Sequence, residues 1–317
     1  MESFPEPITK QNSVVSIKTP TAAQYESKVR HCQDYIRSGD SYELCLTDQT
    51  IVQRHRFGDG DAWALYRILR AGQPAPFASF IRLGSATLIS SSPERFLKWS
   101  AEGHCSLRPM KGTVRKSPEV STLAQAKDLL DVPKEKAENL MIVDLVRHDL
   151  HGVCGSGNVS VPRLMAVEEY KNVFQMITVV EGQIPLLPER YHNGIRKQVM
   201  THRHTGLDVL AASLPPGSMT GAPKKRSCEI LQGIEDKPRS LYSGVVGYMD
   251  VGGRGDWSVT IRSIFRWDDE DVDDGNGGVI ETYHIGAGGA VTMLSTPEGE
   301  REEMLTKLNG TLGIFLR

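Results

Sequence analysis

The chain has 317 residues, of which 39% are hydrophobic and 24% are charged, and its formal net charge is −2. This length and composition suit a globular protein with a sizeable core and exclude a fibrous or disordered chain. The near-neutral charge provides no basic field for nucleic acid, so an anionic ligand has to be held by local positive groups. We therefore expect a small-molecule ligand and no nucleic-acid partner.

The five cysteines lie far apart, are odd in number and form no CxxC pair. This pattern argues against a disulfide framework and against a zinc site. No apolar stretch approaches the roughly 20 residues of a membrane-spanning helix, and residues 1–20 lack the apolar core of an export signal. These features predict a cytoplasmic protein in a reducing compartment, with no membrane partner.

The predicted elements arrive as hairpins and separate helices, which indicates the α+β class with antiparallel sheets. Helical spacing of Tyr25, Val29 and Ile36 predicts a first helix over 21–38, ended by Gly39. Further helices are expected at 61–72, 119–151, 207–216, 222–235 and 297–312, and Pro133 should interrupt the second of these. Single strands are expected at 41–55, 173–184, 242–251, 256–267 and 279–293. Two hairpins are expected, one at 77–92 with its turn at Gly84 and one at 95–110 with its turn near Gly103.

The segment "LPPGSMTGAPKKR" has the features of an anion-binding turn. Gly217 and Gly221 free the backbone, and Pro223 fits the first turn of the following helix. The unpaired N–H groups of a helix N-terminus attract carboxylates or phosphates, and Lys224 lies nearby. The spacing is not that of a P-loop, so a simple turn remains the alternative.

The predicted C-terminal helix places Glu300, Glu303 and Lys307 on one face, for which a solvated surface is the alternative. Glu138 enters an apolar helix, where a buried carboxylate needs a partner such as a hard dication. Lys111 follows a predicted strand, so its amine can project into a cleft, although a lone lysine is usually solvated.

In this order the motifs resemble the chorismate-utilising enzymes, which include the aminodeoxychorismate, anthranilate, isochorismate and salicylate synthases. The resemblance extends from Thr21 to the C-terminus and is carried by "GDSYELCL", "SSPERF", "RPMKGT", "AENLMIVDLVRHDL", "PPGSMTGAPK", "YSGVVGY", "WSVTIRS", "YHIGAGGAV" and "EGEREEMLTK". It implies two large antiparallel β-sheets packed as a sandwich with flanking helices. It also implies a polar segment over 1–20, a catalytic domain over 21–317, and the loss of most of the family's N-terminal half.

The resemblance implies a Mg²⁺ cofactor held by Glu138 and Glu303, with Glu300 beside them. One or two protein carboxylates, completed by water and substrate oxygen, are common ligands of this ion. The 217–224 turn would hold the ring carboxylate of chorismate, and Arg262 is suited to the planar enolpyruvyl carboxylate. The full set of implied substrate-binding residues is Gly217, Ser218, Met219, Thr220, Gly221, Lys224, Tyr242, Arg262, Gly286, Ala287, Gly288 and Lys307.

Lys111 selects the branch of the family, because anthranilate synthases typically have alanine where this chain has "PMKGT". The resemblance implies that the amine of Lys111 attacks C2 of chorismate and that Glu94 acts as general acid, giving aminodeoxychorismate. The amine has to be neutral, and we expect Mg²⁺ and nearby cationic groups to lower its pKa. No cysteine has the context of a glutaminase nucleophile, so ammonia would come from a class I glutamine amidotransferase, as a partner subunit or a fused domain, or from free ammonium.

Two other residues bear on the branch. Glu43 takes the place of the base lysine of isochorismate and salicylate synthases, which argues against addition of water. Gln175 stands where anthranilate synthases, and many bacterial aminodeoxychorismate synthases, have histidine. Anthranilate synthase and a non-catalytic chorismate-binding remnant therefore remain the alternatives.

Overall fold

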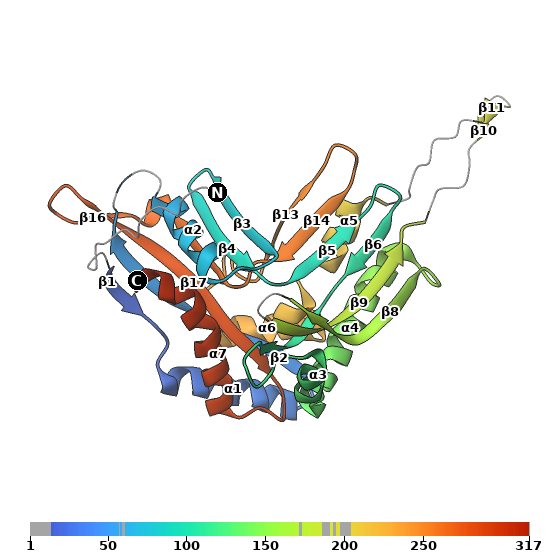
Figure 1. Cartoon of the computed structure of the whole chain (residues 1–317), viewed down its shortest axis with the longest axis horizontal. Helices are drawn as coiled ribbons and strands as arrows, with labels where there is room; N and C mark the ends of the chain where they lie inside the picture. Colours follow the sequence, from blue (N-terminus) through green and yellow to red (C-terminus); the bar gives the residue numbers. More distant parts are fainter. Residues whose placement is uncertain are drawn as a thin grey trace.

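The computed structural model describes residues 14–56, 58, 61–170, 173–185, 191–192, 195–196 and 204–316. Two large antiparallel sheets form its frame, with helices against them, and the sheets diverge toward the top of Figure 1. The expected α+β class, with two antiparallel sheets and flanking helices, is confirmed. Two short strands, β10 (Tyr191–His192) and β11 (Ile195–Arg196), pair with each other in a separate two-stranded sheet.

The first sheet has eight strands, and helices that share its core cover one of its faces. Its order is β1 (Val14–Lys18), β2 (Glu43–His55), β17 (Val279–Val291), β15 (Ser263–Trp267), β4 (Ala86–Ser92) and β3 (Phe77–Leu83), with β12 (Gly221–Ala222) paired to β2 and β16 (Val272–Asp273) to β17. The helices that share its core are α1 (Ala22–Arg37), α2 (Asp61–Gly72), α6 (Lys224–Ile234) and α7 (Pro297–Leu312).

The second sheet has seven strands and a separate core. Its order is β13 (Val245–Met249), β14 (Gly255–Val259), β5 (Arg95–Trp99), β6 (His104–Leu107), β9 (Val173–Gln183) and β7 (Met110–Arg115), with β8 (Val159–Glu169) also paired to β9. The neighbouring helices are α3 (Leu123–Leu130), α4 (Pro133–Cys154) and α5 (Gly206–Ser213). Strand β8 was not predicted, because two irregularities in its pairing with β9 break its alternation.

Two adjacent crossovers join the sheets and position residues of the candidate active site described below. The chain passes from β4 to β5 through Glu94, and from β14 to β15 through Arg262. The crossovers are hydrogen-bonded to each other, since Ser91 donates to the Arg262 carbonyl at 3.1 Å and Val259 donates to the Glu94 carbonyl at 3.2 Å. The prediction of one strand over 256–267 is therefore wrong: the positive φ of 51° at Arg262 breaks it into two strands of different sheets.

The predicted helix boundaries are largely confirmed. Thr21 caps α1 in a capping box with Gln24, and the predicted interruption at Pro133 separates α3 from α4. Pro223 is the N-cap residue of α6 and does not lie within its first turn, which corrects the prediction. Strand β1 lies within residues 1–20 and pairs with β2, while the expected domain boundary at residue 21 stays a prediction.

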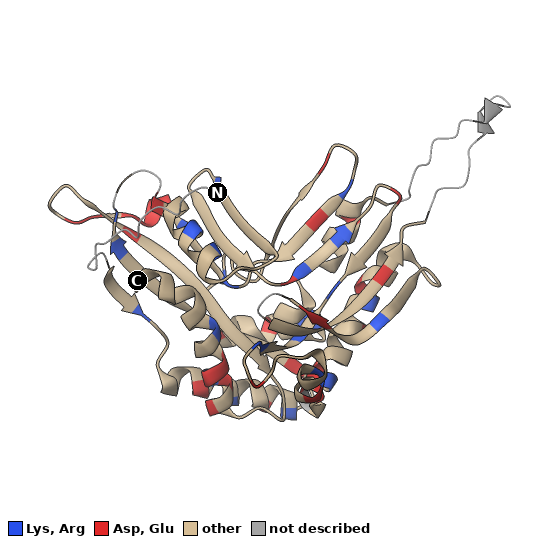
Figure 2. Cartoon of the chain, viewed as in Figure 1, with Lys and Arg blue, Asp and Glu red and all other residues tan. Residues whose placement is uncertain are grey.

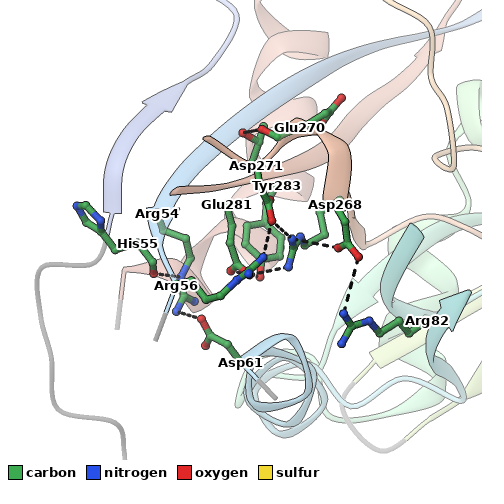
Figure 3. A network of polar contacts seen from close by, with 12 residues as sticks. Arg54, His55, Arg56, Asp61, Arg82, Asp268, Glu270, Asp271, Glu281 and Tyr283 are labelled. Carbon is green, nitrogen blue, oxygen red and sulfur yellow. Dashed lines mark hydrogen bonds and ion pairs between the residues drawn. The ribbon is translucent and has the colours of Figure 1, made fainter. Parts of the chain in front are cut away.

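A buried ion-pair network ties the segment after β15 to the first sheet (Figure 3). Arg266, which is 5% exposed, contacts Glu281 at 2.5 Å and Asp271 at 2.6 Å. Arg56 also reaches Glu281, at 2.9 Å, and Arg54 reaches Asp61 of α2 at 2.6 Å. Removing one partner of such a network leaves an uncompensated buried charge, so we expect it to matter for stability.

The surface carries both charges in close proximity. Figure 2 shows lysines and arginines interspersed with aspartates and glutamates over the strands and the helices. Among the described residues, no helix combines the length and the apolar character needed to cross a membrane. Local groups of side chains, and not an overall field, therefore decide which ligand the chain can bind.

Candidate active site

A cavity of about 510 Å³ lies where the two crossovers meet β2, β7, β17, α4 and α7. We call it the site cavity. It brings together most of the predicted site residues from segments far apart in the sequence. Its lining includes the predicted residues Glu94, Lys111, Glu138, Ser218, Met219, Tyr242, Arg262, Gly288, Glu303 and Lys307.

Lys111 lies on β7, with its amine between two carboxylates. Its Nζ is 3.0 Å from Oε1 of Glu43 and 3.3 Å from Oε2 of Glu138, and its side chain is only 11% exposed. Burial disfavours the charged amine, but Glu43 and Glu138 outweigh this effect and raise the pKa of Lys111. The expected lowering by cationic neighbours is thus wrong for the chain by itself, because the amine contacts carboxylates.

Glu94 lies on the first crossover and is 6% exposed. Burial raises its pKa to about 7, although a hydrogen bond from Ser218 and the charges of Lys111 and Lys307 oppose the shift. The Ser218 hydroxyl donates to Oε1 of Glu94 at 3.1 Å. A carboxyl with this pKa is protonated in a large fraction of molecules near neutral pH, as a general acid requires.

Arg262 and Tyr242 form the wall at the second crossover. Within the described part of the chain, the Arg262 guanidinium has no ion-pair partner, and burial lowers its pKa. The Tyr242 ring packs directly over Gly286, where an added Cβ would lie 2.2 Å from Cγ of the ring. A half-buried, unpaired guanidinium in a cavity is well suited to bind a carboxylate.

Lys307 and Glu303 face the cavity from α7. The Lys307 amine contacts Oε1 of Glu303 at 2.6 Å and donates to the carbonyl of Gly288 at 2.9 Å. The predicted residue Gly286 does not line the site cavity. Ala287, next to the cavity residue Gly288, directs its side chain into the helix-covered core of the first sheet. Its predicted contribution can therefore come only from its backbone.

The predicted anion-binding turn only partly reaches the cavity. Ser218 and Met219, in the short 3₁₀ helix η1 (Gly217–Met219), line it, whereas Gly217, Thr220 and Gly221 do not. Gly221 has φ 134°, and a Cβ there would lie 2.0 Å from the Glu43 carbonyl, so this glycine permits the pairing of β12 with β2.

The structure does not bring the predicted residue Lys224 into the site cavity. Its amine contacts Asp149 of α4 at 2.7 Å and the carbonyl of Ser213 at 3.0 Å, outside the cavity lining. The lysine is therefore used to fasten α6 to α4.

The predicted metal carboxylates differ in whether they reach the site cavity. Glu138 and Glu303 line it, while Glu300 is 2% exposed and accepts a hydrogen bond from Ser295. An added Cβ at Gly289 would meet the carboxylates of both Glu300 and Glu303, at 2.9 and 3.4 Å. Among the described residues there is no group of three or more His, Cys, Asp or Glu that could hold a metal ion.

Two carboxylates facing one cavity nevertheless fit Mg²⁺, which usually takes one or two protein carboxylates and keeps water and substrate oxygens as its other ligands. The donor chemistry of Glu138 and Glu303 is thus compatible with the implied cofactor.

Three charged residues in or beside the site cavity were not predicted as site residues. Glu43 is fully buried and contacts Lys111 without lining the cavity, and it was considered only for its bearing on the branch. Arg115 and Glu135 line the cavity. Period-two spacing from Lys111 along β7 could have indicated Arg115, and i,i+3 spacing from Glu138 along α4 could have indicated Glu135.

An open cleft of about 570 Å³ continues the site cavity past Met110, Thr113, Arg115 and Arg262, which line both. Gln175 lies in this cleft and not in the site cavity. A cavity that joins buried carboxylates and cations to an open cleft is typical of an enzyme site for a small polar anion.

Comparison with known proteins agrees with this class. The model of the family described as chorismate binding enzyme matches residues 2–313, and the chain belongs to this family. Aminodeoxychorismate synthase of Saccharomyces cerevisiae is 42% identical over 95% of the chain, which spans 37% of that relative. Aminodeoxychorismate synthase component 1 of Klebsiella aerogenes is 35% identical over 91% of the chain and 57% of its own length.

Among solved structures, anthranilate synthase component I of Streptococcus pneumoniae has a TM-score of 0.72 and 25% identity, over 95% of this chain and 60% of its own. The chain thus spans less than two thirds of the length of each of these relatives. These matches establish the family of the chain, and the activity of the chain itself is a proposal that rests on its site.

Proposed function

We propose that the chain forms 4-amino-4-deoxychorismate from chorismate and ammonia, with Lys111 as nucleophile and Glu94 as general acid. The observation that carries the proposal is that a buried lysine amine and a carboxyl with a pKa of about 7 line the same small cavity. The names of the relatives at 42% and 35% identity support the same activity.

In the proposed reaction, the Lys111 ammonium first gives up a proton, for which the Glu43 carboxylate lies at hydrogen-bonding distance. The neutral amine forms a bond to C2 of chorismate, the ring double bond shifts, and the C4–oxygen bond breaks. Glu94 protonates the departing hydroxyl, which leaves as water. Ammonia then forms a bond to C4, the double bond shifts back, and the C2–nitrogen bond to Lys111 breaks.

The substrate anions have separate candidate partners in the cavity. Arg262 would bind the enolpyruvyl carboxylate, with Tyr242 and Lys307 beside it. Ser218 and the backbone of η1 would contact the ring carboxylate. Glu138 and Glu303 would hold Mg²⁺, which when bound would supply positive charge to a substrate carboxylate.

The ammonia source and the location of the chain belong to the same proposal. Relatives named "component 1" support a separate subunit that supplies ammonia, for which we propose a class I glutamine amidotransferase. The cytoplasm remains our predicted location, although one relative from Arabidopsis thaliana is named as chloroplastic.

The test is incubation of the purified chain with chorismate, Mg²⁺ and ammonium, followed by mass spectrometry of the products. We expect aminodeoxychorismate from the wild type and none from Lys111→Ala. Anthranilate with pyruvate would instead assign the chain to the anthranilate branch. Binding of chorismate without any product would contradict the proposal and favour a non-catalytic protein.

A further inference from the structure

A second cavity lies behind the site cavity, on the other side of Met219 and Tyr242. This rear cavity has a volume of about 600 Å³ and is lined mainly by α6 and the segment 235–244. Met219 and Tyr242 line both cavities, so they form a thin wall between them. A wall with a cavity on each side receives less support from packing than a core residue does, and another interaction has to fix its position.

The interaction that fixes the wall is made by Arg239. Its Nη1 donates to the carbonyl of Met219 and to Oγ of Ser243, the latter at 3.4 Å, and its Nη2 donates to the carbonyl of Cys45 at 2.8 Å. One guanidinium thus joins η1, the segment next to Tyr242, and β2, whose Cys45 lines the site cavity.

The guanidinium is itself held in place. Glu235 accepts from Nε at 2.8 Å and from Nη2 at 2.6 Å, and the same carboxylate accepts from the backbone and hydroxyl of Thr47. Burial disfavours the charge of Arg239, but the hydrogen bonds and charge of Glu235 raise its pKa, so it stays protonated. A bidentate pair of this kind fixes orientation as well as distance.

The backbone beside Tyr242 needs such a restraint. Ser240 and Ser243 have positive φ values of 52° and 66°. Non-glycine residues adopt this left-handed conformation at a cost and keep it only where surrounding contacts impose it. The contacts here include Arg239 to Ser243, and Thr260, whose hydroxyl donates to the Leu241 carbonyl at 2.6 Å.

We propose that Arg239 is a positioning residue of the active site. It fixes the position of the Met219–Tyr242 wall, and therefore of the Ser218 and Tyr242 side chains that would contact the substrate. The inference rests on the proposed function for the identity of the ligand. Arg239 acts through the wall and lies outside the residues that line the site cavity. Replacing Arg239 should therefore weaken substrate binding even in protein that still folds.

The experiment compares Arg239→Met and Arg239→Lys with the control Arg226→Met in the full chain. Arg226 lies on the neighbouring α6 and also pairs with two carboxylates, Asp40 and Glu229, but on the surface and away from both cavities. Chorismate affinity is measured by calorimetry, KM and kcat with saturating ammonium, and the folded fraction by circular dichroism.

We expect Arg239→Met to raise the Kd and KM for chorismate by about tenfold in folded protein, as loss of a buried charge-assisted contact implies. Arg239→Lys should recover part of this loss, because one amine can reach one carbonyl but cannot span all of them. Arg226→Met should stay within about twofold of the wild type.

A folded Arg239→Met with wild-type Kd and KM would overturn the inference while leaving the proposed function intact. If Arg239→Met does not fold, the Kd of Arg239→Lys decides, and a wild-type value again overturns it. Wild type that binds chorismate but forms no product refutes the proposed function, yet the Kd comparison still tests Arg239. Wild type that binds no chorismate refutes both.

Discussion

Replacing Glu94 with glutamine should change the pH dependence of stability in a direction set by its burial. Burial raises the pKa of Glu94 from 4.5 to about 7. Between these two values, the unfolded chain loses the Glu94 proton while the folded chain keeps it, so this residue lowers the free energy of unfolding as pH rises. At about 1.4 kcal/mol per pKa unit, the full effect above pH 7 is about 3 kcal/mol.

Glutamine keeps the shape of the side chain and cannot ionise, so Glu94→Gln should lose this part of the pH dependence. Urea unfolding at pH 5 and pH 8 measures it: because a small part of the effect is already present at pH 5, the variant should gain about 2.5 kcal/mol relative to wild type on going from the lower to the higher pH. An equal stability difference at both pH values would refute the assignment of a raised pKa.

The same titration predicts the activity. In the wild type, kcat/KM for chorismate should fall as pH rises through about 7, because the acid form of Glu94 is lost. Below pH 7 the variant should be slower by about a hundredfold or more, and its kcat/KM should lack this fall. A variant with wild-type kcat/KM would show that Glu94 is not the general acid.

Three further substitutions test other parts of the structure. Glu281→Ala removes one of the carboxylates that pair with the buried Arg266, which keeps Asp271, and urea unfolding should show a loss of about 2–3 kcal/mol; a loss below 1 kcal/mol would contradict the network of Figure 3. Gly286→Ala places a methyl group 2.2 Å from the ring of Tyr242, so calorimetry should show weaker chorismate binding, and unchanged affinity would place the ring outside the substrate site. Thr21→Ala removes the cap of α1 and should cost about 1 kcal/mol in thermal unfolding, whereas no change would mean that the cap is redundant.

Much of the fold could be predicted because most strands and helices carry clear local patterns. Alternation and glycine turns located the hairpins at Gly84 and Gly103, helical spacing and the stop at Gly39 located α1, and Pro133 located the break between α3 and α4. Strand β8 was missed because bulges interrupt its alternation. The division of 256–267 into two strands depends on the positive φ of Arg262. That conformation arises where the chain passes from one sheet to the other, so the local sequence does not predict it.

The candidate site was predictable to a different degree for each residue. The motifs indicated Lys111, Glu94, Glu138 and Arg262, and the structure brings all four into one cavity. The contact between Lys111 and Glu43 joins residues 68 positions apart and depends on how β7 packs against the start of β2. Its consequence, a raised pKa of Lys111, could not be deduced from the local sequence.

The ion-pair partner of Lys224 also could not be predicted from the sequence. Asp149 lies 75 positions away on α4, and nothing near Lys224 in the sequence indicates that pairing. A cationic side chain next to a glycine-rich turn predicts an anion-binding site only where that side chain does not form an ion pair with a carboxylate of another element.

The central claim is that Lys111 forms a covalent bond to the substrate. The most direct measurement is mass spectrometry of the intact chain after incubation with chorismate and Mg²⁺ without ammonium, followed by peptide mapping. The proposed mechanism predicts a chorismate-derived adduct, formed with loss of water, on Lys111 of the wild type, which disappears when ammonium is added. Turnover of chorismate to aminodeoxychorismate by Lys111→Ala, at the wild-type rate and with no adduct on any residue, would contradict it.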